Sequence, residues 1–123
     1  MAKWQNDLIL DAALNYVKSN GTQVCLCTAQ PTTYTQATST YKIAIKTGLT
    51  SSDFTLADGD VSGRKLTVAA QSNVTVDTPG TATHIAVCSG SVLLFVTTCT
   101  SKAISGDLVN IPAFDYEIED VTA

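Results

Sequence analysis

Apolar residues recur at helical spacing in the first part of the chain. They form two adjoining stripes, one repeating at i, i+4 and i+7 and the other beside it: Leu10, Leu14 and Val17, then Leu8, Ala12 and Tyr16. Asn6 is a suitable N-cap, and Asn20-Gly21 is a typical C-terminal stop. The pattern therefore predicts a helix over residues 6–19.

Beyond Gly21 the spacing of apolar residues changes from helical to alternating. Gln23–Thr28 is apolar on both faces, which is typical of a strand buried on both sides. In the next run the alternation predicts that Tyr41, Ile43 and Ile45 face inward. Further short strands are predicted over six ranges: Arg64–Ala70, Val74–Asp77, Thr83–Cys88, Val92–Thr98, Leu108–Ile111 and Phe114–Ile118.

Two stretches lack a regular pattern and are predicted as loops. Thr32–Thr40 is polar and rich in Thr, and we expect an ordered loop there. Residues 48–63 carry repeated turn signals, so we expect a surface loop anchored by Phe54 or Leu56. Shorter breaks between strands fall at five places: Ser72-Asn73, Pro79-Gly80, Ser89-Gly90-Ser91, Ser105-Gly106-Asp107 and Pro112.

Short strands with Gly, Pro, Asn and Ser between them, and no crossover helices, indicate an antiparallel fold. We expect a mainly β protein: an antiparallel β-sandwich, jelly-roll-like, or a β-barrel, with one N-terminal α-helix. The length of 123 residues is that of one domain, and we assign residues 1–123 to a single β-sandwich domain.

Composition narrows the range of functions. Hydrophobic residues make up 45% of the chain and charged residues 15%, which is typical of a folded protein with a nearly neutral surface. Such a surface is easily desolvated against neighbouring proteins. The net charge of −4 argues against nucleic acid as a partner, because phosphate binding needs clustered Lys and Arg. No apolar run approaches the ~18 residues of a membrane span, and no secretion signal is visible, so we expect folding in the cytoplasm and no membrane partner.

Four cysteines are candidates for a metal or disulfide site: Cys25, Cys27, Cys88 and Cys99. In the cytoplasm they would be reduced and would pack mainly as small apolar side chains. Cys25 and Cys27 are separated by one residue, fewer than the two to four usual in structural zinc sites. We therefore expect core packing for all four, with a zinc site or a bond to another cysteine as alternatives.

The register of one predicted hairpin tests a bond between Cys88 and Cys99. If Ser89-Gly90-Ser91 closes that hairpin, Cys88 faces Val92 and Cys99 faces Thr81. The two thiols would then lie about 20 Å apart along the sheet. We expect no disulfide between them.

Other reactive groups have structural interpretations. His84, the only histidine, lies in no nucleophile motif. Asp58-Gly59-Asp60, with Asp53 nearby, could hold a cation, but it lacks the alternating oxygen ligands and the closing Glu of a calcium loop. We therefore expect a tight turn with solvated acidic side chains there. The last strand carries an acidic row, Asp115, Glu117 and Glu119. Paired carboxylates serve glycoside hydrolysis, but a row on one outer face favours a charged surface strand. We expect no catalytic residue, no cofactor and no metal.

The acidic row would also suit a basic patch on a neighbouring subunit. Candidate partners are of two kinds: Lys42 with Lys46, or Arg64 with Lys65.

The chain resembles a family of small virion structural proteins of tailed phages and prophages. The matching stretches follow one another over nearly the whole length: Asn6-Asp7, 10–16, 27–34, 37–41, Ser62-Gly63-Arg64-Lys65, 80–84, Leu93-Leu94, 105–107 and Ile111-Pro112-Ala113-Phe114-Asp115. They are collinear patches and contain no catalytic signature. The resemblance implies a component of the particle and does not decide between head and tail.

Among particle components, we favour a capsid decoration or cement protein, located in the virion after assembly in the host cytoplasm. The resemblance implies the major capsid protein as partner and self-association as a dimer or trimer. Candidate assembly contacts are seven residues: Trp4, Tyr34, Phe54, Arg64, Asp115, Glu117 and Glu119. Two alternatives remain, a tail or head-fibre component with receptor-binding loops and a small carbohydrate-acting enzyme that uses the acidic row.

Overall fold

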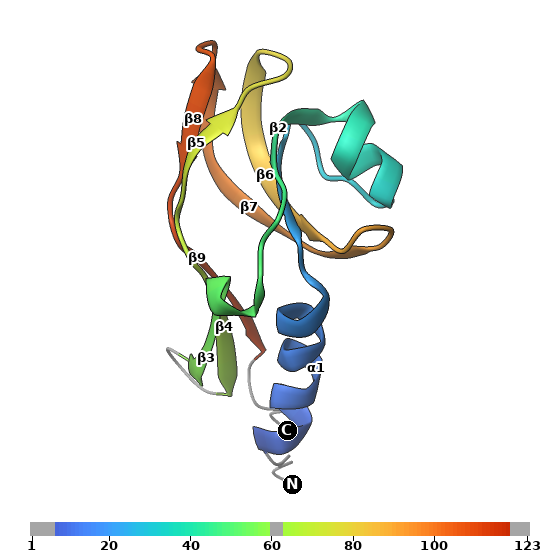
Figure 1. Cartoon of the computed structure of the whole chain (residues 1–123), viewed down its shortest axis with the longest axis vertical. Coiled ribbons are helices and arrows are strands. Elements are labelled where there is room, and N and C mark those ends of the chain that lie inside the picture. The colour runs from blue at the N-terminus through green and yellow to red at the C-terminus, as the bar shows by residue number, and fades with distance from the viewer. Residues whose placement is uncertain (1–6, 60–62, 119–123) are drawn as a thin grey trace, which may run out of the picture.

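The computed structural model describes residues 7–59 and 63–118 and has one N-terminal helix followed by antiparallel strands (Figure 1). The elements follow in this order: α1 Asp7–Asn20, β1 Gln23–Cys27, η1 Gln36–Thr40, β2 Lys42–Lys46, η2 Ser51–Asp53, β3 Phe54–Asp58, β4 Arg64–Val68, β5 Gln71–Thr75, β6 Gly80–Cys88, β7 Leu93–Ile104, β8 Leu108–Ile111 and β9 Phe114–Ile118.

The strands form two layers. The first is a four-stranded sheet in the order β2-β1-β6-β7, and every neighbouring pair in it is antiparallel. The second contains a three-stranded sheet, β3-β4-β9, and a two-stranded sheet, β5-β8. Among the described residues these strands close no barrel, so of the two predicted architectures the layered one is found.

The two sheets of the second layer are parts of one long ribbon. Val68 pairs with Phe114, and Gln71 pairs with Ile111. From the first pair to the second, one strand advances by three residues and the other goes back by three. The register is therefore the same on both sides of the gap. Pro112 lies in the gap and has no N–H to donate to the ladder, which explains why the pairing is interrupted there.

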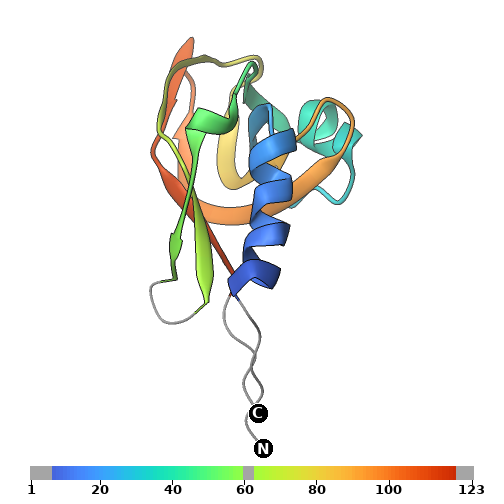
Figure 2. The same ribbon diagram turned by 60° about the horizontal axis from the view of Figure 1, so that its bottom comes forward.

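The main core lies between the layers and is closed at one end by α1. Leu26 and Val87 of the first layer belong to the same buried cluster as Leu66 and Ile111 of the second. Figure 2 shows α1 beside the β3–β4 hairpin, and the helix packs on β3, β4 and η2. A helix that packs on one stripe in this way buries one face and leaves the other outside the core.

A second, smaller core covers the opposite face of the four-stranded sheet. Cys25, Cys27 and Cys88 are buried there together with Ala86, and Ala37 of the η1 segment packs on them. The sheet is thus buried on both faces at β1, as its continuous apolar run predicts.

Most predicted elements are confirmed, and two predicted loops are wrong. The helix and the strands predicted from Gln23, Arg64, Leu108 and Phe114 are present with bounds within two residues. The Thr-rich stretch contains η1, a short π-helix whose Ala37 is buried in the second core. Residues 54–58 form the strand β3, because Phe54 and Leu56 pack in the main core.

A bulge in β2 overturns the predicted alternation of that strand. Leu26 pairs with Ala44 and Cys27 pairs with Lys42, so Ile43 is one residue extra. Both Ile43 and Ala44 therefore enter the main core. The remaining predicted inward side chains of this strand, Tyr41 and Ile45, pack against the second core.

A second irregularity lies in β5, where a strand break was predicted. The register shifts between Gln71 and Val74, and Asn73 has a φ of 57°. Asn tolerates this left-handed conformation better than most residues, so the turn signal marks a bulge within the strand.

The β6–β7 hairpin has a different register from the predicted one. Ser89 donates its N–H to the carbonyl of Val92 at 2.9 Å, so the turn spans four residues and Cys88 pairs with Leu93. Thr81 pairs with Ala103, not with Cys99. All four cysteines are free thiols in this structure.

Gly21 permits the closest approach between the helix end and β3. A Cβ atom at this position would lie 2.8 Å from Cζ of Phe54 and 2.8 Å from the carbonyl oxygen of Val17. Gly21→Ala should therefore lower the free energy of unfolding by about 1–3 kcal/mol, measured by urea denaturation. Gly90→Ala is the matched control, because its new Cβ meets nothing within 4 Å, and it should change stability by less than about 0.5 kcal/mol. Equal effects at the two positions would contradict this packing.

Candidate assembly surface

Helix α1 has two apolar faces, and the core uses one of them. Leu10, Leu14 and Val17 are 2%, 0% and 7% exposed. On the other side Ile9 is 65% exposed and Tyr16 is 59% exposed, with Ala12 and Ala13 exposed between them. We call Ile9, Ala12, Ala13 and Tyr16 the apolar stripe of α1.

The apolar stripe carries no charge. Between residues 8 and 20 the only charged residues are Asp11 and Lys18, and both are half-buried at the flank of the helix. Charged and polar side chains are the usual occupants of the solvent face of a surface helix. An uncharged outer face is instead typical of the core of a protein interface.

A hollow beside the stripe extends this surface. Its volume is about 410 Å³, and it lies between the helix, the β6–β7 turn and β9, lined by Ala13, Tyr16, Val17, Val92, Leu93, Leu94 and Tyr116. Val92 at the tip of the turn is 48% exposed. The hollow is large enough to receive an apolar side chain of a partner, and such filled pockets supply much of the affinity of protein interfaces.

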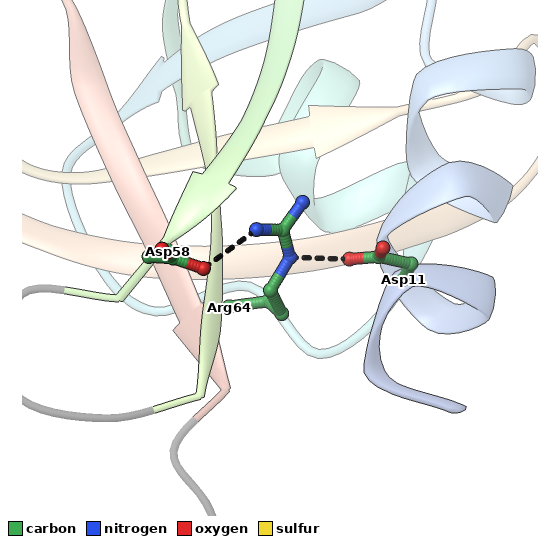
Figure 3. Close-up of polar contacts among 3 residues, drawn as sticks. All are labelled: Asp11, Asp58 and Arg64. Carbon is green, nitrogen blue, oxygen red and sulfur yellow. Dashed lines mark hydrogen bonds and ion pairs between the residues drawn. The ribbon is translucent and has the colours of Figure 1, made fainter. Parts of the chain in front are cut away.

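Arg64 holds the helix against the β3–β4 hairpin (Figure 3). Its Nε donates to Oδ1 of Asp11 at 2.7 Å, and its Nη1 donates to Oδ1 of Asp58 at 2.8 Å. The hydrogen bonds to Asp11 and then Asp58 raise the pKa of Arg64 above its ordinary value. Because Arg64 bridges two elements, it fixes how α1 sits on the second layer and hence which face of the helix remains exposed.

Two of the other basic side chains expected to meet a neighbouring subunit also have partners in their own chain. Lys42 Nζ lies 2.9 Å from a carboxylate oxygen of Asp77. Lys65 Nζ lies 3.6 Å from Asp115 and is directly opposite Glu117 in the β4–β9 register. Among residues 7–59 and 63–118, no carboxylate forms such a pair with Lys46.

The structure places the described residues of the predicted contact set as follows. Tyr34 is half-buried over the second core and donates its hydroxyl to Gln23 Oε1 at 3.3 Å. Phe54 is 2% exposed and is therefore a core side chain and not a surface one. Asp115 is exposed, accepts a hydrogen bond from the Thr67 hydroxyl at 2.7 Å, and shares its strand with half-buried Glu117.

Trp4 and Glu119 lie outside the described residues. The predicted contact residues that the structure describes thus mostly contact other residues of their own chain. Their contact with a partner stays a prediction.

The second core holds three fully buried thiols, Cys25, Cys27 and Cys88. Burial is the first cause that raises the pKa of Cys27, to about 12, and neighbouring Cys88 and Cys99 add to it. The pKa of Cys25 is raised too, first by a thiol hydrogen bond with Cys88 and then by burial. The same hydrogen bond lowers the pKa of Cys88. Cys25 and Cys27, whose raised pKa values keep them protonated, are poor nucleophiles and poor metal ligands. In the described residues no three Cys, His, Asp or Glu side chains are grouped so as to hold a metal ion.

The remaining candidates have local partners. His84 Nδ1 and the Thr83 hydroxyl are 2.8 Å apart. Asp58 binds Arg64, and Asp60 lies outside the described residues.

A second apolar hollow of about 270 Å³ opens between β6, β7 and β8, and a third lies beside the β7–β8 turn. None of these three hollows is lined by a carboxylate, so neither Asp115 nor Glu117 of β9 lines any of them.

No family model, curated protein or solved structure matches the chain. Within the described part of the chain, no helix is both long and apolar enough to span a membrane.

Sequence reasoning missed Ile9 and Val92, the exposed ends of this surface. For Ile9 the sequence did contain a signal, the second apolar stripe of the helix. A helix that packs on a core with one face needs only one apolar stripe, so a second stripe indicates a further exposed apolar surface. Val92 gave no signal, because it was assigned to the strand that follows the turn.

The buried Cys27 thiol predicts a fall in stability at alkaline pH. Its pKa is about 12 in the folded protein and 9.0 as the ordinary value, so the unfolded chain loses the proton first. The stabilisation is complete below pH 9.0 and is lost as pH rises toward about 12.

Unfolding in urea with a reductant should show this effect. Between about pH 8 and about pH 10.5, Cys27 should contribute roughly 2 kcal/mol of lost stability. Cys27→Ala should have a shallower pH dependence, whatever its stability at neutral pH. An identical slope for the variant and the natural protein would contradict a buried, neutral thiol.

Proposed function

We propose that this chain is a structural protein of a tailed-phage particle, a decoration or cement protein that binds the assembled head shell. The observation that carries the proposal is the apolar stripe of α1 with its neighbouring hollow, an exposed surface without charge. Ile9 and Tyr16 stand more than half exposed there, and a surface of this kind is stabilised when another protein covers it.

The distribution of charge supports the same conclusion. Arg64, Lys42 and Lys65 pair with carboxylates of their own chain, so they add little net field to the surface. Salt bridges that are already formed need not be broken or desolvated anew when a neighbour approaches elsewhere. The protein is therefore suited to association driven by apolar contact and shape.

The mechanism is mass action on an assembly. A protein that binds the closed shell and not its dissociated subunits stabilises the shell by RT ln(1 + [L]/Kd) for each site. The major capsid protein is the proposed partner, with the chain itself as a second partner. No cofactor and no catalytic group take part.

The proposal also separates the chain from a carbohydrate-acting enzyme. Such an enzyme needs two carboxylates facing a cleft. Asp115 instead binds Thr67 and Lys65 on the surface of the second layer.

Co-sedimentation tests the proposal. The purified full chain is mixed with empty head shells of the phage that encodes it, and separately with the dissociated capsid subunits. The chain should bind the shells at a fixed ratio to the capsid subunits and should raise the temperature at which the shells disrupt. It should not bind the dissociated subunits.

Other outcomes would overturn the proposal. Binding to purified tails or to host cells without binding to shells would support a fibre component. Hydrolysis of a glycan that is lost in Glu117→Gln would support the enzyme.

A further inference from the structure

The apolar hollow between β6, β7 and β8 reaches into the main core. Its inner wall is formed by core side chains of both layers, each 7% exposed or less: Leu26, Ala82, Ile85, Ile104 and Ile111. Its volume of about 270 Å³ lies just below the range of small-molecule sites, which are concave and lined mainly by apolar side chains. The hollow therefore fits a small apolar group.

The hollow beside the β7–β8 turn continues the apolar one toward the surface. The two share a set of lining residues and so adjoin along β7 and β8: Lys102, Ile104, Val109 and Asn110. The outer hollow is lined in addition by the polar turn, residues 105–106. A ligand that occupies both hollows must therefore have an apolar body and a polar head.

Two side chains at the junction of the hollows favour a negatively charged head. Lys102 is exposed, and among residues 7–59 and 63–118 no carboxylate forms an ion pair with it. Asn110 accepts the N–H of Asn73 through Oδ1 at 2.9 Å, which leaves its Nδ2 group available as a donor. No lining residue of either hollow is acidic, so the wall does not repel an anion. An ammonium beside an amide donor suits a carboxylate.

We propose that this site binds a medium-chain carboxylic acid, with the alkyl chain among the core side chains and the carboxylate at Lys102 and Asn110. The inference goes beyond the proposed function. The site shares no lining residue with the hollow beside α1, so the acid and a partner on the apolar stripe occupy different surfaces. Because the site lies between the two layers, the bound acid stabilises the fold by mass action.

Isothermal titration calorimetry of the full chain with octanoate tests the site, and octanol is the uncharged comparison ligand. Octanoate should bind with a dissociation constant on the order of millimolar or lower, as its size allows. Lys102→Met removes the charge and keeps the apolar stem, so it should weaken octanoate binding by roughly three- to tenfold and leave octanol binding unchanged. Lys46→Met is the matched control, because it removes the same charge and Lys46 lines none of the three hollows.

Cys99 gives a second, independent measure of occupancy. It lines the apolar hollow and is half-buried, whereas the other three cysteines are fully buried on the opposite face of the sheet. A thiol reagent should therefore modify Cys99 first in the native protein. Saturating octanoate should slow this modification in the natural protein. It should not do so in Val109→Phe, because the larger ring fills the junction of the two hollows.

Three results would overturn the inference. They are the absence of both heat and Cys99 protection with octanoate, an equal loss of octanoate affinity in Lys102→Met and Lys46→Met, or protection of Cys99 that folded Val109→Phe retains. If Val109→Phe fails to fold, the two lysine variants decide, because neither lysine belongs to the core. Binding to shells without binding of octanoate would overturn this inference and leave the proposed function standing.

Discussion

The packing of α1 across one end of the two β layers is the contact on which the rest of the account depends. Leu14 and Val17 enter the main core with Phe54, and Gly21 lets the ring of Phe54 approach the helix end. The ion pair between Arg64 and Asp11 adds a directional contact at the flank. Because a helix can bury only one face against a flat neighbour, this arrangement leaves a second apolar stripe exposed.

Exposure of this apolar stripe to water is unfavourable, and the stripe itself carries no charged side chain. Arg64 and Lys42 form ion pairs with carboxylates of the same chain, and three thiols are buried beneath η1. In the part of the chain that the structure describes, Arg64, Lys42 and the buried thiols thus have contacts within the fold. The exposed surface of α1 is an apolar one, and this observation is the basis of the proposed association with other proteins.

Much of the fold could be predicted because its signals are local. The helix follows from the spacing of Leu10, Leu14 and Val17, and β1 follows from a continuous apolar run. The bulge at Ile43 could not be predicted, because it arises from pairing with a strand distant in sequence. Strand β3 was hidden by turn residues around it, and its pairing with β4 overrides them.

The candidate surface was predicted less well for the same reason. Charged residues such as Arg64 and Asp115 are readily predicted as contacts for a partner. The fold decides whether they instead form ion pairs within the chain, because it brings together residues that are distant in sequence. Tyr16 shows the reverse case, a residue of an apolar stripe that the fold leaves outside.

Hydroxyl-radical footprinting of Tyr16 tests the central claim most directly. The modification rate of Tyr16 is compared between the dilute protein and the protein in its assembled state, with half-buried Tyr34 as an internal reference. The account predicts strong protection of Tyr16 on assembly while Tyr34 changes little. An unchanged rate at Tyr16 in the assembled state would contradict it.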